Sequence, residues 1–227
     1  MMGKLYIVAT PIGNLADITF RAVEVLGGVD LILAEDTRKS RILLSHYKIK
    51  KPVISFHQHS RERKVQFVID KIKEGKDIAY ITEAGTPAIA DPGGELVEKL
   101  VAQLPEVKII PIPGASALTV ALSVAGMPAD QFLFVGYLPK KKGRQTLLGK
   151  LAKMDWPQTL VFYESPYRLV RTLEDLAKYL GQDKKMIVCR ELTKMFEEIY
   201  RGSISEAIEH FSQKEVKGEI TIVIYCD

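Results

Sequence analysis

Apolar residues along this chain gather in short, nearly unbroken runs, a pattern typical of strands that are buried on both faces of a sheet. In the first half of the chain these runs cover residues 5–9, 29–34, 53–56, 77–81 and 107–112. Between the third and fourth runs, apolar residues at the helical period share one face and are followed by a glycine: Val65, Val68, Ile69, Ile72 and Gly75. The alternation of strand and helix predicts a mostly parallel sheet with helices on both sides.

A second series of runs follows a helix expected at about residues 116–125, and it covers 132–137, 159–164, 185–192, 197–202 and 219–225. Ser165 followed by Pro166 is typical of a helix start. The leucines that form the apolar stripe of this helix, and the glycine that ends it, are Leu169, Leu173, Leu176, Leu180 and Gly181. Too few residues separate the third and fourth runs for a helix, so we expect a hairpin and some antiparallel pairing. Two consecutive α/β domains, 1–115 and 116–227, therefore fit better than one long sheet.

Composition places the chain among ordinary globular proteins. It has 227 residues, of which 47% are hydrophobic and 26% charged, and its net charge of +4 permits an anionic partner without requiring one. Cys189 and Cys226 lie in apolar runs, which favours free thiols in a reducing compartment over a disulfide. The amino-terminal apolar run is too short for a signal peptide, and no stretch is long enough to span a membrane. We therefore expect a soluble cytoplasmic protein.

Three loops rich in glycine and proline follow strands of the first sheet. They read "ATPIGN" at residues 9–14, "TEAGTPAIADPGG" at 82–94 and "PIPGAS" at 111–116. Ligands of open α/β sheets bind at the carboxyl ends of the strands, and glycine lets the backbone approach a ligand closely. Any one loop is explained equally well as a structural turn. Three of them at one edge predict a pocket built largely from main-chain groups.

Common fingerprints do not identify the ligand of this pocket. The chain has no G-x-G-x-x-G dinucleotide loop, no P-loop and no G-x-S-x-G elbow. His57 and His59 place two imidazoles close together, but a third zinc ligand is not evident. Polar residues at the rim of a cleft, in contact with substrate, explain these histidines better than a metal site does.

Basic residues form three clusters: Lys140, Lys141, Lys142 and Arg144; Arg38, Lys39 and Arg41; Arg61, Arg63 and Lys64. A single charge cluster is most often only a solvated face. Several clusters near the same edge would instead form a track for the phosphates of a nucleic acid. The residues alone thus indicate a small-molecule cleft and leave nucleic-acid binding open.

Seven motifs carry a resemblance to a known family. In chain order they read "VATPIGNL", "EDTRKSRILLSHY", "EAGTPAIADPG", "IPGASA", "GYLPKKKGR", "FYESPYR" and "RELTK.FEEIYRG". Together they resemble the 16S ribosomal RNA cytidine-2′-O-methyltransferases of the tetrapyrrole methylase superfamily. Each motif is weak by itself, but the ordered set covers nearly the whole chain and is specific.

The resemblance implies two αβα domains, the first sheet mostly parallel and the second mixed, with S-adenosylmethionine in the cleft between them. It also implies a homodimer that methylates a cytidine ribose at the decoding centre of the small ribosomal subunit. The residues implied to bind the cofactor are Pro11, Gly13, Glu83, Ala84, Gly85, Thr86, Pro87, Gly114, Ala115, Ser116, Tyr163, Glu164, Arg190, Glu191, Leu192, Thr193 and Glu219. On this reading, side chains added at Gly85 or Gly114 clash with the cofactor.

The chain departs from the family pattern in a few places. Lys39-Ser40 and Tyr167 stand where relatives often have histidine, and Glu83 stands where aspartate is common. Histidine at those positions therefore cannot be essential here. Many relatives also continue past the final strand into a small helical extension. We expect this chain to hold RNA without it.

Methyl transfer to a ribose hydroxyl calls for a general base, and no motif demands a metal. Four carboxylates are candidates that the sequence does not rank, and a purely structural role as a cap or as a member of an ion pair stays open for each: Glu83, Asp91, Glu164 and Glu191. The residues expected to contact RNA phosphates are Lys140, Lys141, Lys142 and Arg144, with Arg38, Arg41, Arg61 and Arg63 across the cleft. The rival functions are a tetrapyrrole or other small-molecule methylase, a protein methylase, and a non-catalytic RNA-binding protein. None of these explains the basic loops and the cofactor pocket together.

Overall fold

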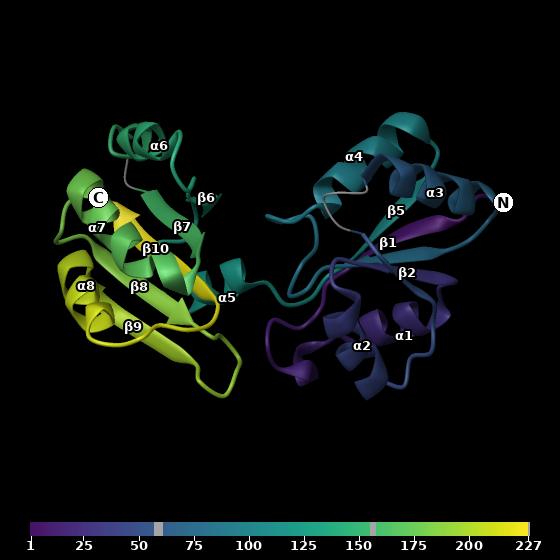
Figure 1. Cartoon of the computed structure of the whole chain (residues 1–227), viewed down its shortest axis with the longest axis horizontal. Helices are drawn as coiled ribbons and strands as arrows, with labels where there is room; N and C mark the ends of the chain where they lie inside the picture. Colours follow the sequence, from purple (N-terminus) through teal and green to yellow (C-terminus); the bar gives the residue numbers. More distant parts are fainter. Residues whose placement is uncertain (57–60, 155–157, 227) are drawn as a thin grey trace. The chain divides into compact units, whose positions relative to one another are not determined.

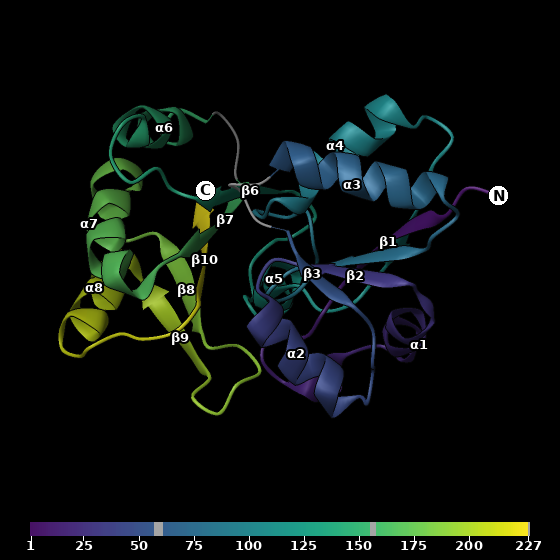
Figure 2. The same ribbon diagram turned by 45° about the vertical axis from the view of Figure 1, so that its right-hand side comes forward.

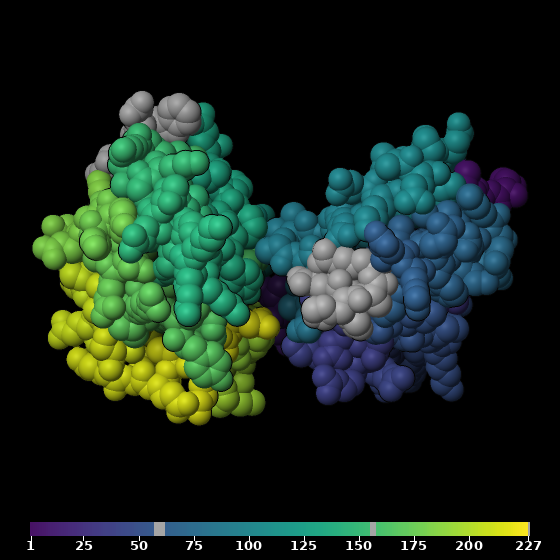
Figure 3. All heavy atoms as spheres, turned by 45° about the horizontal axis from the view of Figure 1, so that its top comes forward, coloured from purple at the N-terminus to yellow at the C-terminus, as the bar shows by residue number. Residues whose placement is uncertain are grey.

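The computed structural model describes residues 1–56, 61–154 and 158–226, with the side chain of residue 61 excepted. The chain forms two compact units, Met1–Ser116 and Ala117–Asp227. Each unit is a five-stranded sheet with helices packed against it (Figure 1). Figure 3 shows that the atoms within each unit are closely packed at the surface. The predicted α/β class is confirmed.

The first sheet has the strand order β3-β2-β4-β1-β5, and every pairing in it is parallel. Its strands are β1 (Lys4–Val8), β2 (Leu31–Ala34), β3 (Val53–Ser55), β4 (Ile78–Ile81) and β5 (Lys108–Ile112). The central strands β2 and β4 are buried throughout, as their apolar runs predict. The prediction that the strand is buried on both faces is wrong for β5, because this strand lies at an edge of the sheet and exposes Lys108 and Pro111.

Helices cover both faces of the first sheet: α1 (Phe20–Gly28), α2 (Thr37–His46), α3 (Arg61–Lys73) and α4 (Gly93–Gln103). Leu31, Leu33 and Tyr80 point to the α3 and α4 side, while Ile32 and Ile81 point to the α1 and α2 side. Figure 2 shows the two pairs of helices on opposite sides of the strands. Alternate side chains of each central strand thus pack into two separate hydrophobic cores, one on each face of the sheet.

The strands β1 and β4 are neighbours in the sheet, and the chain turns toward opposite faces of the sheet after them. The chain leaves β1 through a short 3₁₀ turn, Leu15–Asp17, to α1 on one face, and it leaves β4 to α4 on the other face. Open α/β sheets bind their ligands where successive connections diverge in this way. Two of the glycine- and proline-rich loops lie at this point.

The second sheet has the order β6-β7-β10-β8-β9, in which only β6 and β7 pair in parallel. Its strands are β6 (Phe132–Tyr137), β7 (Gln158–Glu164), β8 (Lys185–Arg190), β9 (Glu198–Ser203) and β10 (Ile220–Cys226). Its helices are α5 (Ala117–Ser123), α6 (Arg144–Leu151), α7 (Leu169–Leu180) and α8 (Ile204–Ser212). The mixed sheet and the hairpin between β8 and β9 are both confirmed.

Buried leucines of α6 and α7 pack on Leu160 and Phe162 of β7, together with Phe211 of α8. This core explains the leucine stripe of α7, although Leu180 is only partly buried. The helix start differs from the prediction. Residues Pro166–Arg168 form a 3₁₀ turn and α7 begins at Leu169, while the Ser165 side chain makes no capping hydrogen bond.

No helix in the described part of the chain combines the length and the apolar character that crossing a bilayer requires.

Candidate functional site

Hydrogen bonds join the three glycine- and proline-rich loops of the first unit. Thr10 and Gly85 exchange two backbone hydrogen bonds, with N···O distances of 2.9 and 3.1 Å. The Thr86 hydroxyl donates to the carbonyl of Ala115 at 3.0 Å. The loops after β1, β4 and β5 therefore form one connected rim.

Two glycines of this rim are required by the rim itself. A Cβ at Gly114 would lie 2.9 Å from the Cβ of Ala9, and one at Gly85 would lie 3.1 Å from Cγ2 of Ile12. Gly85 also has a φ of +81°, a conformation that favours glycine. The predicted clash of larger side chains at these positions thus occurs first with the protein's own loops.

The length of the loop 82–94 has a structural cause. The carboxylate of Asp91 accepts hydrogen bonds from the backbone N–H of Ala88, at 3.0 and 2.9 Å, and from that of Gly93 at 2.6 Å. Ala88 and Ala90 have φ values of +68° and +61°, at a cost of about 1–3 kcal/mol each. The loop is a folded turn organised around Asp91. These hydrogen bonds favour a structural role for Asp91 over the predicted role of general base, which stays a prediction.

The rim carries an acid that the sequence analysis missed. Glu35 follows the buried strand β2 and accepts a hydrogen bond from the Thr82 hydroxyl at 3.0 Å. Burial raises the pKa of Glu35, and the nearby charges of Glu83 and Asp91 raise it further, against the Thr82 hydrogen bond. An acid that directly follows a buried strand at the predicted rim is the signal that would have found it.

Glu83 remains accessible on the same rim. Its side chain is 37% exposed and forms an ion pair with Lys39 of α2. Of the two candidate bases in this unit, Glu83 is therefore the one whose carboxylate is not bound to the backbone of its own turn. Glu35 and Glu83 together make the rim locally acidic.

Basic residues of the first unit lie on the helices that follow β2 and β3. Arg38 is exposed and pairs with Asp36, whose carboxylate also accepts from the Arg38 backbone N–H at 2.8 Å. Arg41 and Arg63 are exposed on α2 and α3. His57, His59 and the side chain of Arg61 lie outside the described residues, so the predictions for them stay predictions. Where the chain is described, no three His, Cys, Asp or Glu side chains cluster as metal ligands do.

In the second unit Glu164 is committed to structure. Its side chain is fully buried, pairs with Arg168, and accepts from the Ser165 backbone N–H at 2.7 Å and from the Thr172 hydroxyl at 2.6 Å. A buried carboxylate with this many partners cannot reach a substrate proton. Glu164 is therefore corrected from candidate base to anchor of the turn that begins α7.

Arg144 is also corrected. Only 5% of it is exposed, and its guanidinium donates to Asp175 at 2.6 Å, to the Thr172 hydroxyl at 2.9 Å and to the carbonyl of Pro139 at 3.4 Å. It cannot contact a phosphate from this position. Its three neighbours in the basic loop, Lys140–Lys142, are exposed as predicted for phosphate contacts.

The motif after β8 is organised around Lys194, which the sequence analysis did not name. Lys194 pairs with Glu191 at 2.8 Å and with Glu219 at 3.1 Å, and the backbone N–H of Glu219 donates to Glu191 at 2.9 Å. Glu191 and Thr193 have φ values of +52° and +66°. The structure thus brings Glu191 and Glu219 together, although nearly thirty residues separate them. A lysine three residues after Glu191, in the same motif, is the signal that could have identified Lys194 as a partner of the predicted carboxylates.

These contacts make Glu191 a poor proton acceptor. Burial raises its pKa, but hydrogen bonds from Lys194 and from the Glu219 backbone outweigh burial, so the pKa of Glu191 is lowered. For Lys194 the opposite holds. Burial lowers its pKa, the two carboxylates outweigh that effect, and the pKa of Lys194 is raised. Lys194 therefore keeps its positive charge and is paired with the carboxylates of Glu191 and Glu219.

The other residues of the second unit that are predicted to bind the cofactor differ in burial and in their contacts. Tyr163 is partly buried, with its ring 4.9 Å from that of Phe134 and 5.7 Å from that of Tyr137. Arg190 pairs with Glu198 at 2.9 Å, and Leu192 is buried. The cofactor roles of all these residues stay predictions.

Comparison with known proteins gives a consistent result. The family model of the tetrapyrrole (corrin/porphyrin) methylases matches residues 4–208. A protein of Thermotoga maritima named ribosomal RNA small subunit methyltransferase I is 48% identical over 223 residues, which are 98% of this chain and 98% of that protein. A protein of Synechocystis sp. with the same name is also 48% identical, over 98% of this chain and 79% of that protein.

Solved structures share the fold at lower identity. A cobalt precorrin-4 methyltransferase of cobalamin biosynthesis is similar with a TM-score of 0.70 and 20% identity, over 97% of this chain and 94% of that chain. A uroporphyrin-III C-methyltransferase from Thermus thermophilus, in complex with S-adenosylhomocysteine, has a TM-score of 0.69 and 18% identity over 97% of both chains.

Proposed function

Because this chain belongs to the tetrapyrrole methylase family and, within it, to the ribosomal RNA small subunit methyltransferase I family, we propose that it methylates 16S ribosomal RNA. The methyl donor is S-adenosylmethionine, and the acceptor is the 2′-oxygen of a cytidine at the decoding centre. The observation that carries the proposal is 48% identity over nearly the whole length of both proteins. The family that the seven motifs predict is thereby confirmed.

The rim of the first unit fits such a donor. S-adenosylmethionine is a sulfonium cation, and nearby carboxylates favour a positive charge. Glu35 and Glu83 supply them at the carboxyl ends of β2 and β4. The connected loops offer main-chain groups close to Gly13 and Gly114, which are both exposed. The predicted cleft between the two domains stays a prediction, as do the cofactor contacts in the second unit.

The bound donor supplies an already activated methyl group. The chain's task is to hold the ribose hydroxyl in line with that group, and correct placement is worth about 7–11 kcal/mol. Glu83 accepts the hydroxyl proton, because Asp91 and Glu164 accept hydrogen bonds from the turns that follow them or hold them, and Glu191 has a lowered pKa. A general base of this kind contributes about 10²- to 10⁴-fold.

Two experiments test the proposal. Calorimetry should detect binding of S-adenosylmethionine and S-adenosylhomocysteine to the protein alone, and the absence of both contradicts the proposal. Tritiated donor is then offered with small ribosomal subunits, free ribosomal RNA, a porphyrinogen and a protein extract. We expect label in the RNA of the small subunit. Label in the porphyrinogen or in protein would favour a rival methylase, and binding of RNA without transfer would favour a non-catalytic protein.

The homodimer and the cytoplasmic location also stay predictions. Sedimentation of the protein at several concentrations measures the first directly.

A further inference from the structure

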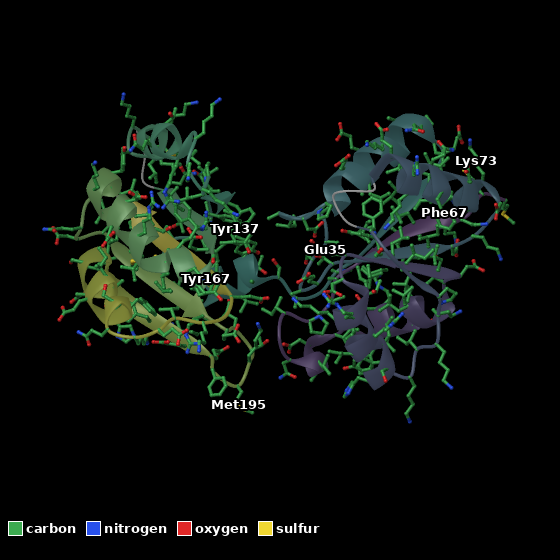
Figure 4. All side chains as sticks on the ribbon, viewed as in Figure 1. Glu35, Phe67, Lys73, Tyr137, Tyr167 and Met195 are labelled. Atoms are coloured by element: carbon green, nitrogen blue, oxygen red, sulfur yellow. The ribbon has the colours of Figure 1, made fainter. Side chains whose placement is uncertain are left out.

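Two aromatic rings stand exposed at one edge of the second sheet. Tyr167, in the 3₁₀ turn after β7, is 93% exposed, and Tyr137, the last residue of β6, is 55% exposed. Since β6 and β7 are parallel, their carboxyl ends lie at the same edge of the sheet. Figure 4 labels both tyrosines, together with Met195 between β8 and β9.

The turn that presents Tyr167 is rigidly held. Proline fixes the backbone at Pro166, directly before the tyrosine. Directly after it, Arg168 pairs with the buried Glu164 and donates to the carbonyl of Leu138 at 3.1 Å. The exposed ring therefore projects from a backbone that is tied down on both sides.

The same buried network holds the lysine loop. Glu164 accepts from Thr172, Thr172 accepts from Arg144, and Arg144 donates to the carbonyl of Pro139 at the start of that loop. Arg168 adds a second link through Leu138. One hydrogen-bond network within the second unit thus joins the backbone segments that present the exposed lysines and Tyr167.

We propose that Tyr167 is a stacking platform for an unpaired base of the RNA, whose neighbouring phosphates contact Lys140–Lys142. This inference rests on the proposed function and specifies how its substrate is held. Aromatic side chains beside a basic track are the usual means of binding single-stranded RNA, because every base has a face that can stack. A ring that is nearly fully exposed on a rigid turn is ready for such a contact.

Charge distinguishes RNA from a second copy of this chain as the occupant. In a symmetric dimer built on this surface, the three lysines of one copy would face those of the other, which is unfavourable. A polyanion has no such penalty. The surface therefore fits RNA better than it fits itself.

The test compares Tyr167→Ala with Tyr167→Phe, which keeps the ring, and with Phe20→Ala. Phe20 is 97% exposed at the start of α1, so this control removes an equally exposed ring from the other unit. Fluorescence anisotropy measures binding of a labelled, unstructured oligoribonucleotide and of small ribosomal subunits at several salt concentrations. Calorimetry measures binding of S-adenosylmethionine, and sedimentation measures the oligomeric state.

We expect Tyr167→Ala to weaken RNA binding by about 5- to 150-fold at every salt concentration. The salt slope stays unchanged, because no phosphate contact is lost. Tyr167→Phe and Phe20→Ala bind RNA as the wild type does, and all variants keep their affinity for S-adenosylmethionine. An unchanged affinity of Tyr167→Ala for RNA overturns the inference. So does a changed oligomeric state without RNA, which would place the ring in a contact between copies.

Failure of the proposed function gives a different result. In that case the wild-type protein itself transfers no methyl group to small-subunit RNA. A wild type that transfers normally, together with a Tyr167→Ala variant that binds RNA normally, removes only the role of Tyr167.

Discussion

The lysine loop of the second unit allows the mode of RNA binding to be measured. Lys140–Lys142 are exposed, whereas Arg144 at the end of the loop is buried and anchors it. Changing the three lysines to glutamine therefore removes charge from the surface and leaves the buried network in place. If the lysines contact phosphates, RNA binding by the variant must depend less steeply on salt than binding by the wild type.

The magnitude follows from the number of exposed charges. Each phosphate neutralised on single-stranded RNA contributes about −0.7 to the slope of log affinity against log salt. Three lysines thus predict a slope that is less steep by about 2. Arg144 is not counted, because its guanidinium is occupied by Asp175, Thr172 and Pro139.

The assay measures affinity for small-subunit RNA across a salt series, and the chain offers a matched control. Lys50, Lys108 and Lys185 are also exposed, but they precede β3 or begin β5 and β8, at the opposite ends of the strands. Changing these three to glutamine likewise lowers the net charge from +4 to +1. We expect the control to keep the wild-type slope.

Two results would refute this reasoning. Equal slopes for the two triple variants would show that the lysine loop makes no specific phosphate contact. A variant of Lys140–Lys142 that keeps its salt dependence but loses S-adenosylmethionine would place the loop in the donor site.

Three further predictions concern the carboxylates and the rim. Glu35 has a raised pKa, so the stability that its protonated form contributes is lost as pH rises through that pKa. In a denaturant titration at neutral pH, Glu35→Gln should therefore be at least as stable as the wild type. In calorimetry the same variant should bind S-adenosylmethionine more weakly. For Glu198, burial raises the pKa, but hydrogen bonds from Lys214, His210 and Arg190 outweigh it and lower the pKa to about 2. The stability that Glu198 contributes is present above its unfolded-state pKa and is lost as pH falls through about 2. Glu198→Gln should therefore lower the free energy of unfolding at neutral pH, by less than about 3 kcal/mol because the side chain is 23% exposed. At the acidic end of a pH series the same substitution should have no effect on stability. Gly114→Ala forces its Cβ against Ala9 and should lower the melting temperature even without S-adenosylmethionine; an unchanged value would mean that the rim adapts.

Local patterns predicted the fold well because they act over short distances. The alternating cores of β2 and β4 and the leucine stripe of α7 follow from the period of apolar residues. The exposure of β5 and the start of α7 were harder to predict. Exposure of an edge strand depends on its neighbours in the sheet, and the 3₁₀ turn depends on Glu164.

The roles of charged residues were harder to predict, since they depend on long-range partners. Arg144 belongs to a run of basic residues, and nothing nearby in the sequence indicates that Asp175 and Thr172 bury it. Glu164 likewise belongs to one of the seven motifs, but its buried carboxylate is paired with Arg168 and bonded to Thr172. Glu35 could have been found, because it directly follows a buried strand at the predicted rim.

The most direct test of the central claim identifies the methylated nucleoside. Small ribosomal subunits are incubated with the protein and S-adenosylmethionine, and their RNA is digested to nucleosides and analysed by mass spectrometry. We predict a gain of 2′-O-methylcytidine that maps to the decoding centre and is absent without the protein. Methylation of a base, or no methylation of small-subunit RNA at all, would contradict the account.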